Sequence, residues 1–208
     1  MHARNVVKTG PRSALFARQA IVGRDQQIVA YELLYRGPAS QEHAAVTDDV
    51  KATDTVIQHS LFRLGIRRSV GRAGAFINMN AESLHATTTE ALPQDRVVLE
   101  LLESVPITAA LIDRCRQLKS RGFRLALDDF VHDDERYQPL LAIVDVVKVD
   151  IPMVDPNRLQ GLIERLRRHP AKLLAEKVDS EASAKACRAL GFDLFQGHFF
   201  GRPRLVVG

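Results

Sequence analysis

The 208-residue chain has only two cysteines, Cys115 and Cys187, which form no Cys-x-x-Cys pair. This scarcity argues against a disulfide scaffold or a cysteine-rich zinc site and fits a reducing compartment. Long apolar runs are also missing. The longest, Leu140–Val147, is interrupted by Asp145 and is far shorter than the roughly 20 residues of a membrane-spanning helix. No apolar segment follows the basic residues of Met1–Pro11, so no secretory signal is predicted. We therefore expect a cytoplasmic protein with no membrane span.

No low-complexity segment and no Pro/Gly/Ser-rich linker divides the chain, so one domain is expected. We predict a flexible N-terminal arm over residues 1–14 and a single barrel domain over residues 15–205. Lys and Arg number 29 against 25 Asp and Glu, which gives a net charge of +4. This excess allows a nucleotide partner. No basic cluster is interleaved with aromatic residues, so no DNA partner is expected.

Apolar residues make up 46% of the chain and are arranged in a regular order. Ala20–Val22 and Ile28–Tyr31 flank a polar turn and predict an antiparallel hairpin. A helical period covers about Asp49–Ile66 and ends near Gly65. After it, β-prone runs alternate with helical segments, which is typical of parallel βα units. These runs are Ala75–Met79, Val97–Leu101, Arg124–Leu127, Val144–Val149, Lys172–Ala175 and Phe192–Phe195.

Serine and glycine residues mark the expected limits of two of the helices. Ser104 is predicted to cap a helix that ends at Gly122, and Ser180 one that ends at Gly191. Together with the hairpin, these units give seven barrel-type strands and one short antiparallel strand that leads into them. We therefore predict an α/β fold, a modified TIM barrel with an antiparallel strand at its start.

Polar residues stand where the successive strands end. They are Glu32, Asn78, Glu100, Asp128, Asp129, Lys148, Asp150, Glu176 and Gln196. From Asn78 onward the strand ends are 22, 28, 20, 28 and 20 residues apart, and each interval is about one βα unit. Because all strands of such a barrel point their carboxyl ends into one mouth, we expect these side chains to converge.

Several carboxylates in one mouth would repel one another unless cations were present. Mg²⁺ or Mn²⁺ would relieve this repulsion, because these ions prefer carboxylate and amide oxygens. Adjacent Asp128 and Asp129 could bridge two ions, the usual arrangement for phosphodiester hydrolysis. Lys148 could orient water, assist proton removal or neutralise phosphate charge. Each position alone is more often a cap, a turn or an interstrand ion pair, but their joint occurrence at strand ends favours a site.

The same residues lie in segments that resemble the motifs of the EAL domain of bacterial cyclic di-GMP signalling. The matching segments, in the order of the family's motifs, are Tyr31–Arg36, Phe76–Asn80, Leu99–Glu103, Leu127–Phe130, Val147–Asp150, Ala175–Asp179 and Gln196–Pro203. Leu33 replaces the alanine of the first motif, and Ala175–Asp179 is similar to Ala-Glu-Gly-Val-Glu. The resemblance covers about Leu15–Pro203 and is greatest to the subgroup that precedes an HDOD module.

The resemblance implies a metal-dependent phosphodiesterase that hydrolyses cyclic di-GMP to linear pGpG. It implies two Mg²⁺ or Mn²⁺ ions held by Glu32, Asn78, Glu100, Asp128, Asp129 and Glu176. Lys148 would help to activate water, with Glu176 and Asp129 as further catalytic residues. Arg36 would clamp a phosphate, and Leu33 and Gln196 would contact the substrate, although a core position for Leu33 is equally compatible. Glu103 would steady the loop that follows Asp129.

The sequence departs from the family pattern in three places, and two of them, the loop after Phe130 and Asp179, support an alternative function. The segment Val131–Arg136 has no glycine, whereas the family usually has a glycine-rich loop there. Asp179 replaces the second glutamate of its motif, and the stretch between Arg36 and Asn78 is short. The alternative is a catalytically inactive EAL-like domain that acts as a cyclic di-GMP receptor or a protein-interaction module. Family members often pair through this loop, which allows a homodimer or a protein partner.

Overall fold

The computed structural model describes residues 16–35, 65–131 and 134–206. The predicted arm of residues 1–14 and Arg36 lie outside the described residues, as does most of the helix predicted over Asp49–Ile66. Over the described residues, no helix is both long enough and apolar enough to span a membrane.

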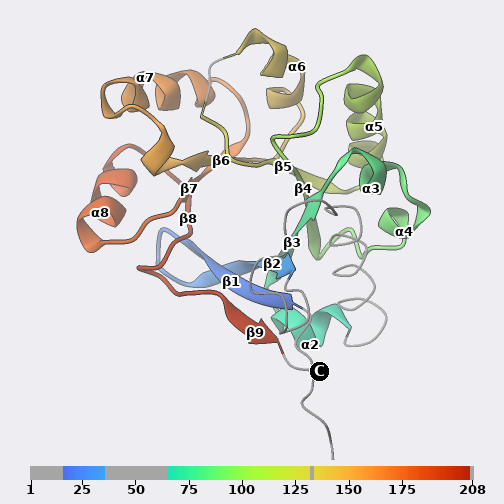
Figure 1. The fold of residues 1–208 in the computed structure, drawn as a ribbon, viewed down its shortest axis with the longest axis horizontal. Coiled ribbons are helices and arrows are strands. Elements are labelled where there is room, and N and C mark those ends of the chain that lie inside the picture. Colours follow the sequence, from blue (N-terminus) through green and yellow to red (C-terminus); the bar gives the residue numbers. More distant parts are fainter. Residues whose placement is uncertain (1–15, 36–64, 132–133, 207–208) are drawn as a thin grey trace, which may run out of the picture.

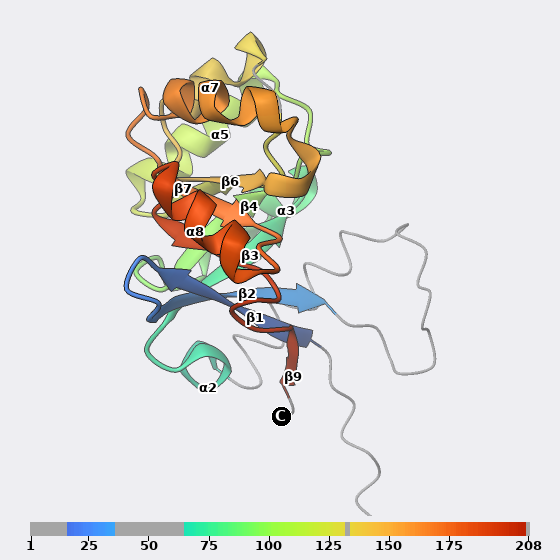
Figure 2. The same cartoon turned by 90° about the vertical axis from the view of Figure 1, so that its left-hand side faces the viewer.

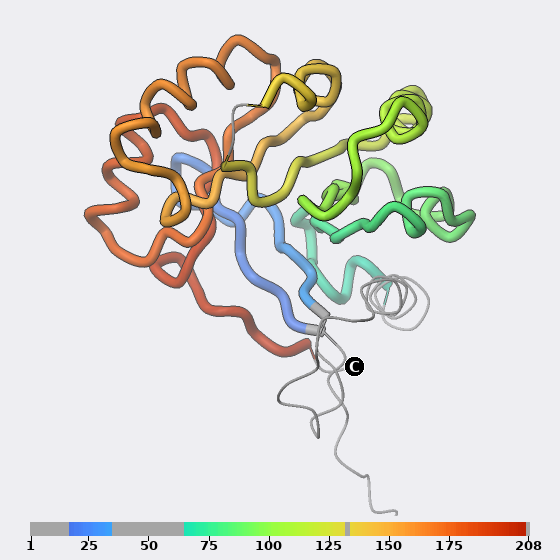
Figure 3. The backbone as a smooth tube through the Cα atoms, turned by 45° about the horizontal axis from the view of Figure 1, so that its top comes forward, coloured from blue at the N-terminus to red at the C-terminus, as the bar shows by residue number. Residues whose placement is uncertain are grey.

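Eight strands form a closed barrel. They are β1 (Phe16–Gly23), β2 (Ile28–Tyr35), β3 (Gly74–Met79), β4 (Val97–Leu101), β5 (Arg124–Leu127), β6 (Val146–Asp150), β7 (Lys172–Glu176) and β8 (Leu194–Phe195). Strands β2 to β8 pair in parallel in chain order. β1 is antiparallel to both β2 and β8 and closes the ring between them. Figure 3 shows this blue hairpin between the red C-terminal strands and the β3 side. The predicted barrel with seven parallel strands and one antiparallel strand is confirmed.

The hairpin is longer than the sequence pattern indicated. β1 and β2 each have eight residues, so the leading strand is not short. Its turn is closed by hydrogen bonds between Gly23 and Gln27 and between Gln26 and Gly23, both 3.0 Å. A ninth strand, β9 (Arg204–Val206), pairs with the first residues of β1 and was not predicted, because three residues carry little periodicity.

Helices cover the outer side of the ring. They are α2 (Ile66–Val70), α3 (Ala81–His85), α4 (Thr87–Glu90), α5 (Ala109–Ser120), α6 (Gln138–Leu141), α7 (Pro156–Leu166) and α8 (Glu181–Ala189), with short 3₁₀ turns η2 (Glu135–Tyr137) and η3 (Ile151–Met153). Figure 1 shows α3 to α8 arranged around the strands. In the side view of Figure 2, α2 and β9 lie on the hairpin side, away from α5 and α7.

One of the two predicted helix starts is confirmed and one is wrong. Ser180 caps α8 by accepting a hydrogen bond from the Ser183 amide. α5 begins four residues later than predicted, where Thr108 rather than Ser104 accepts from the Leu111 amide at 3.1 Å. Pro106 explains the difference, because a proline disfavours helical backbone at the residue before it. The predicted ends hold: Gly122 and Gly191 follow their helices with φ of 95° and 96°.

The strands separate two sets of apolar side chains, because successive residues of a strand point to opposite faces. The larger core lies between the strands and the helices and includes both cysteines. A smaller cluster lies inside the barrel, and we call it the apolar layer. Its buried members are Ile21, Ala30, Phe76, Val98, Ala126, Val146 and Leu174.

Candidate active site

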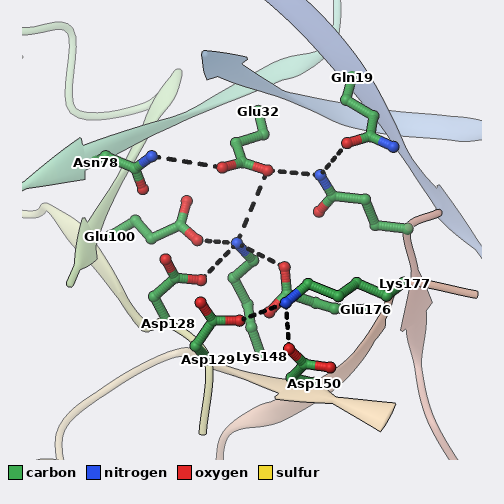
Figure 4. A network of polar contacts seen from close by, with 11 residues as sticks. Gln19, Glu32, Asn78, Glu100, Asp128, Asp129, Lys148, Asp150, Glu176 and Lys177 are labelled. Atoms are coloured by element: carbon green, nitrogen blue, oxygen red, sulfur yellow. Dashed lines mark hydrogen bonds and ion pairs between the residues drawn. The ribbon is translucent and has the colours of Figure 1, made fainter. Parts of the chain in front are cut away.

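A second layer of side chains lies inside the barrel, two residues beyond the apolar layer on the parallel strands and two residues before it on the antiparallel β1. We call it the polar layer, and its members are Gln19, Glu32, Asn78, Glu100, Asp128, Lys148, Glu176 and Gln196. They come from all eight strands or the residue directly after a strand. Figure 4 shows the labelled members pointing toward one another. The convergence expected from the strand-end spacing is therefore present.

Lys148 lies at the centre of the polar layer and is 1% exposed. Its ammonium Nζ donates to an Asp128 oxygen at 2.8 Å and to Glu100. It also lies 3.0 Å from a Glu176 oxygen and 3.8 Å from a Glu32 oxygen. One buried cation thus faces four carboxyl groups from four strands or strand ends.

Glu32 is held from the side of the barrel opposite the paired aspartates. The Asn78 side-chain amide donates to Oε1 of Glu32 at 3.4 Å, and Gln196 Nε2 donates to Oε2 at 2.5 Å. The same Gln196 nitrogen donates to the side-chain oxygen of Gln19 at 3.2 Å. These amides fix the direction of the Glu32 carboxylate, which would otherwise be free to rotate.

The turn that carries Asp128 and Asp129 is fixed by its backbone. The Asp128 amide donates to the Leu101 carbonyl at the end of β4, at 3.0 Å. The Phe130 amide donates to the Lys148 carbonyl on β6, at 2.8 Å. Between them Asp129 has a left-handed backbone with φ of 44°. Held in this way, oxygens of Asp128, Asp129 and Glu176 all lie within 4.8 Å of one another.

A second lysine lies at the edge of the polar layer. The Lys177 ammonium donates to Asp150, whose side chain is 3% exposed, and lies 3.5 Å from an Asp129 oxygen. Lys177 follows β7 with φ of 55°. The next residue, Val178, is packed so closely against Gly197 that a Cβ at position 197 would lie 2.0 Å from the Val178 carbonyl oxygen. Only glycine fits there, and this contact fixes the segment that carries Glu176 and Lys177.

Burial dominates the electrostatics of the polar layer. It raises the pKa of Glu176 to about 7, although Lys148 partly offsets the shift, and it holds the pKa of Glu100 well above the usual range. Burial opposes the charge of Lys148, yet Glu100 and the other carboxylates hold its pKa well above the usual range. For Asp128, the attraction of Lys148 outweighs burial and lowers the pKa. The lysine is therefore charged, whereas burial without a metal ion favours the protonated forms of Glu100 and Glu176.

The residues present fit additional cations. Five buried oxygens in and beside the polar layer have no hydrogen-bond partner: Asn78 Oδ1, Glu100 Oε2, Asp150 Oδ1, Glu176 Oε2 and Gln196 Oε1. Buried polar atoms in proteins are normally paired. All five are carboxylate or amide oxygens, which are the ligand atoms that Mg²⁺ and Mn²⁺ prefer.

Three of the predicted site residues lie outside this constellation. Leu33 is 1% exposed and belongs to the larger core, because its neighbour Glu32 takes the inward face of β2. This placement favours the core role for Leu33. Glu103 is exposed in the turn after β4, and residues 132–133 of the loop it would steady are not among the described residues. Arg36 also lies outside the described part of the chain, so its role stays a prediction.

The sequence reasoning did not assign three residues that the structure brings to the site. Gln19 precedes the apolar-layer residue Ile21 by two positions on the antiparallel strand, so its contact with Gln196 required knowledge of the register. Asp150 stands at a strand end in the sequence, but the pattern predicts no function for it. Lys177 had a visible signal, since it stands where the resembled motif has glycine.

The comparisons with known proteins agree with this geometry. A family model described as the EAL domain matches residues 16–203. The uncharacterized protein YuxH of Bacillus subtilis is 35% identical over 196 residues, which cover 92% of this chain and 48% of YuxH. The cyclic di-GMP phosphodiesterase CdgJ of Vibrio cholerae is 31% identical over 194 residues, which cover 91% of this chain and 44% of CdgJ. The chain thus spans about half the length of these curated relatives.

Solved structures share the barrel. The PaMucR phosphodiesterase, in complex with c-di-GMP, superposes with a TM-score of 0.75 at 19% identity, over 92% of this chain and 97% of that one. The Bacillus subtilis YkuI protein, solved with c-di-GMP and calcium, gives 0.74 at 20% identity, over 93% of this chain and 55% of that one. At these identities the likeness shows the fold.

Proposed function

Because the chain belongs to the EAL domain family, we propose that its barrel hydrolyses cyclic di-GMP to linear pGpG with two Mg²⁺ or Mn²⁺ ions. The observation that carries this proposal is the polar layer, in which Glu32, Glu100, Asp128 and Glu176 surround one buried lysine and leave oxygens unpartnered. A stable core has no need of such an arrangement, since buried polar groups without partners destabilise the fold.

The side chains divide into two ion-binding groups. Glu32, Asn78, Glu100 and Asp128 would hold an inner ion, deeper in the barrel. Asp128, Asp129 and Glu176 would hold an outer ion, and their oxygens are already close together. When bound, such a pair of ions lowers the pKa of a water molecule and stabilises the charge on the leaving oxygen.

The chain's own groups would position the substrate and the water. The Lys148 ammonium, which the carboxylates surround in the metal-free site, would face the developing phosphate charge. Gln196, supported by Gln19, would keep the Glu32 carboxylate directed at the inner ion. Arg36 is proposed to clamp a phosphate with its planar guanidinium group. Hydrolysis adds one water across one phosphodiester bond, so one P–O bond forms as another breaks.

The test is to incubate the purified protein with cyclic di-GMP and Mn²⁺ or Mg²⁺ and to follow pGpG by chromatography. We expect turnover that EDTA abolishes. Glu176→Gln should reduce the rate roughly 10²–10³-fold, because one charged oxygen of the outer ion group is lost. The matched control is Glu164→Gln on the exposed side of α7, which should leave turnover unchanged. Intact binding of cyclic di-GMP without turnover in either metal would contradict the proposal.

The alternative, a receptor or protein-interaction module, has one structural observation in its favour. The Lys177 ammonium already lies beside Asp129, so one of the outer ion's carboxylates has a partner without metal. Equilibrium dialysis with cyclic di-GMP separates the two functions, because a receptor binds the nucleotide without producing pGpG. Membership of the subgroup that precedes an HDOD module and formation of a homodimer remain predictions.

A further inference from the structure

We infer that Lys177 acts as a tethered cation that competes with the outer divalent ion for Asp129, and so sets the metal concentration at which that ion binds. This inference rests on the proposed function, because it concerns the same acidic mouth. It assigns a regulatory role to a residue that none of the proposed catalytic steps uses.

The position of the Lys177 ammonium supports this role. It lies 3.5 Å from Oδ1 of Asp129 and donates a hydrogen bond to Asp150. Figure 4 shows it between these two carboxylates at the edge of the polar layer. Asp129 is also one of the three residues whose oxygens cluster within 4.8 Å. The ammonium and a divalent ion would therefore share one ligand, and their like charges would repel each other.

The backbone directs the lysine to this place. Glu176 faces the barrel interior, so a regular strand would turn the next side chain toward the helices. The left-handed backbone at Lys177, with φ of 55°, turns it over the mouth instead. Glycine adopts this conformation without strain, whereas a lysine does so at a disadvantage. The strain is offset only if the side chain contributes something, and its contacts here are with Asp150 and Asp129.

The two lysines of the site differ in freedom. Lys148 is 1% exposed and is enclosed by carboxylates, so its ammonium has no path to solvent in this structure. The Lys177 side chain is 55% exposed and can swing into solvent. Asp150 would then lose its partner while its second oxygen, already unpartnered, stays buried. Binding of the outer ion thus requires Lys177 to leave Asp129 at the expense of its contact with Asp150, which raises the metal concentration at which the ion binds.

The experiment measures Mn²⁺ binding without nucleotide, by electron paramagnetic resonance of free Mn²⁺ and by calorimetry. Lys177→Met removes the charge and keeps the length, and Lys177→Gly also suits the backbone. Both should lower the Kd of one ion roughly tenfold, a modest factor because the lysine is largely exposed. Lys177→Arg, which keeps the charge, should change it less than twofold. In an Asp129→Asn background, Lys177→Met should change the Mn²⁺ affinity much less, because the ligand for which the two cations compete has lost its charge.

The outcomes separate the inference from the function on which it rests. Equal Mn²⁺ affinities in the wild type, Lys177→Met and Lys177→Gly would overturn the inference alone. Unchanged Mn²⁺ affinity with a raised KM for cyclic di-GMP would also overturn it, and would make Lys177 a phosphate ligand. Absence of Mn²⁺ binding in every variant would overturn the two-ion function and the inference together. Binding that appears only in Lys177→Met would support the inference in its strongest form.

Discussion

The apolar layer and the polar layer occupy the same barrel interior but have opposite chemistry. Both layers come from the same strands. On each parallel strand, the polar-layer residue follows the apolar-layer residue by two positions and faces the same interior, as Glu100 follows Val98 on β4 and Glu176 follows Leu174 on β7. The apolar layer is complete by itself, because its members need only one another. The polar layer is incomplete, because its carboxylates exceed the lysines that face them. The comparison shows that the backbone geometry places side chains in two layers inside the barrel. The residue types alone decide which layer can bind metal ions and substrate.

The two ends of the barrel also differ in charge. The amino-terminal ends of the strands border a cavity of about 930 Å³, whose charged lining is mainly basic. The basic residues are Arg72, Arg96, Arg116, Lys119, Arg124 and Lys172, and the acidic ones are Asp95 and Asp145. The net charge of +4 is thus borne partly by the end opposite the acidic mouth. The positive net charge is compatible with a nucleotide partner. The carboxylates at the carboxyl ends of the strands indicate that metal ions would be needed to bind such a partner there.

Removing Lys148 should break the polar layer and give the largest effect. Without divalent ions, Lys148→Met should lower the free energy of unfolding by about 3–5 kcal/mol, because three buried carboxyl groups and the partly buried Asp128 lose their common cation. Mn²⁺ should restore much of this loss, since it supplies positive charge to the same oxygens. Urea denaturation with EDTA and with Mn²⁺ measures both effects. Equal destabilisation under the two conditions would contradict the expected role of Lys148.

The loss should also depend on pH. The pKa of Glu176 is about 7 in the fold against 4.5 ordinarily, so its protonated form is favoured in the folded state. Folding is therefore weakened as pH rises from about 4.5 through 7. Lys148 lowers this pKa, and its removal should extend the weakening above pH 7. Lys148→Met should accordingly lose more stability at pH 8 than at pH 6.

A substitution in the apolar layer should destabilise the protein by an amount that does not depend on metal ions. Leu174 is fully buried inside the barrel. Leu174→Ala should lower the free energy of unfolding by about 3 kcal/mol through lost burial and a cavity. The loss should be the same with EDTA and with Mn²⁺, because the Leu174 side chain has no oxygen or nitrogen atom that could bind a metal ion. A metal-dependent loss in the same urea experiment would show that the two layers are not independent.

Much of the polar layer was predictable, because the strand ends recur at intervals of one βα unit. A buried parallel strand has a continuous apolar run, so a charged residue such as Glu100 or Lys148 within or just after it is conspicuous. The apolar layer was not predictable as a separate cluster, since apolar residues on both faces of a strand look alike in the sequence. Only the closed barrel shows that Val98 faces inward and Leu99 outward.

The missed features depend on contacts between distant segments. Gln19 reaches Gln196 only because β1 lies antiparallel between β2 and β8, which short-range patterns do not reveal. The start of α5 at Thr108 required weighing Pro106 against the cap signal of Ser104. Lys177 required its left-handed backbone, because in a regular strand its side chain would point away from the mouth.

Backbone strain at Lys177 should have the smallest effect on stability, and it can be compared with the same strain at Gln26, at the opposite end of the barrel. Lys177→Gly and Lys177→Ala both lose the ion pairs, so their difference isolates the left-handed backbone at φ 55°. The glycine variant should be more stable by about 1 kcal/mol in urea denaturation. Gln26, with φ of 64° in the β1–β2 turn, is the matched control at the opposite end. Gln26→Gly should be more stable than Gln26→Ala by a similar free energy of unfolding. Neither variant should alter the Mn²⁺ affinity, because no carboxylate of the polar layer lies in that turn. If the two variants at position 177 were equally stable, the backbone would not be strained, and the argument that the Lys177 side chain offsets that strain would fail.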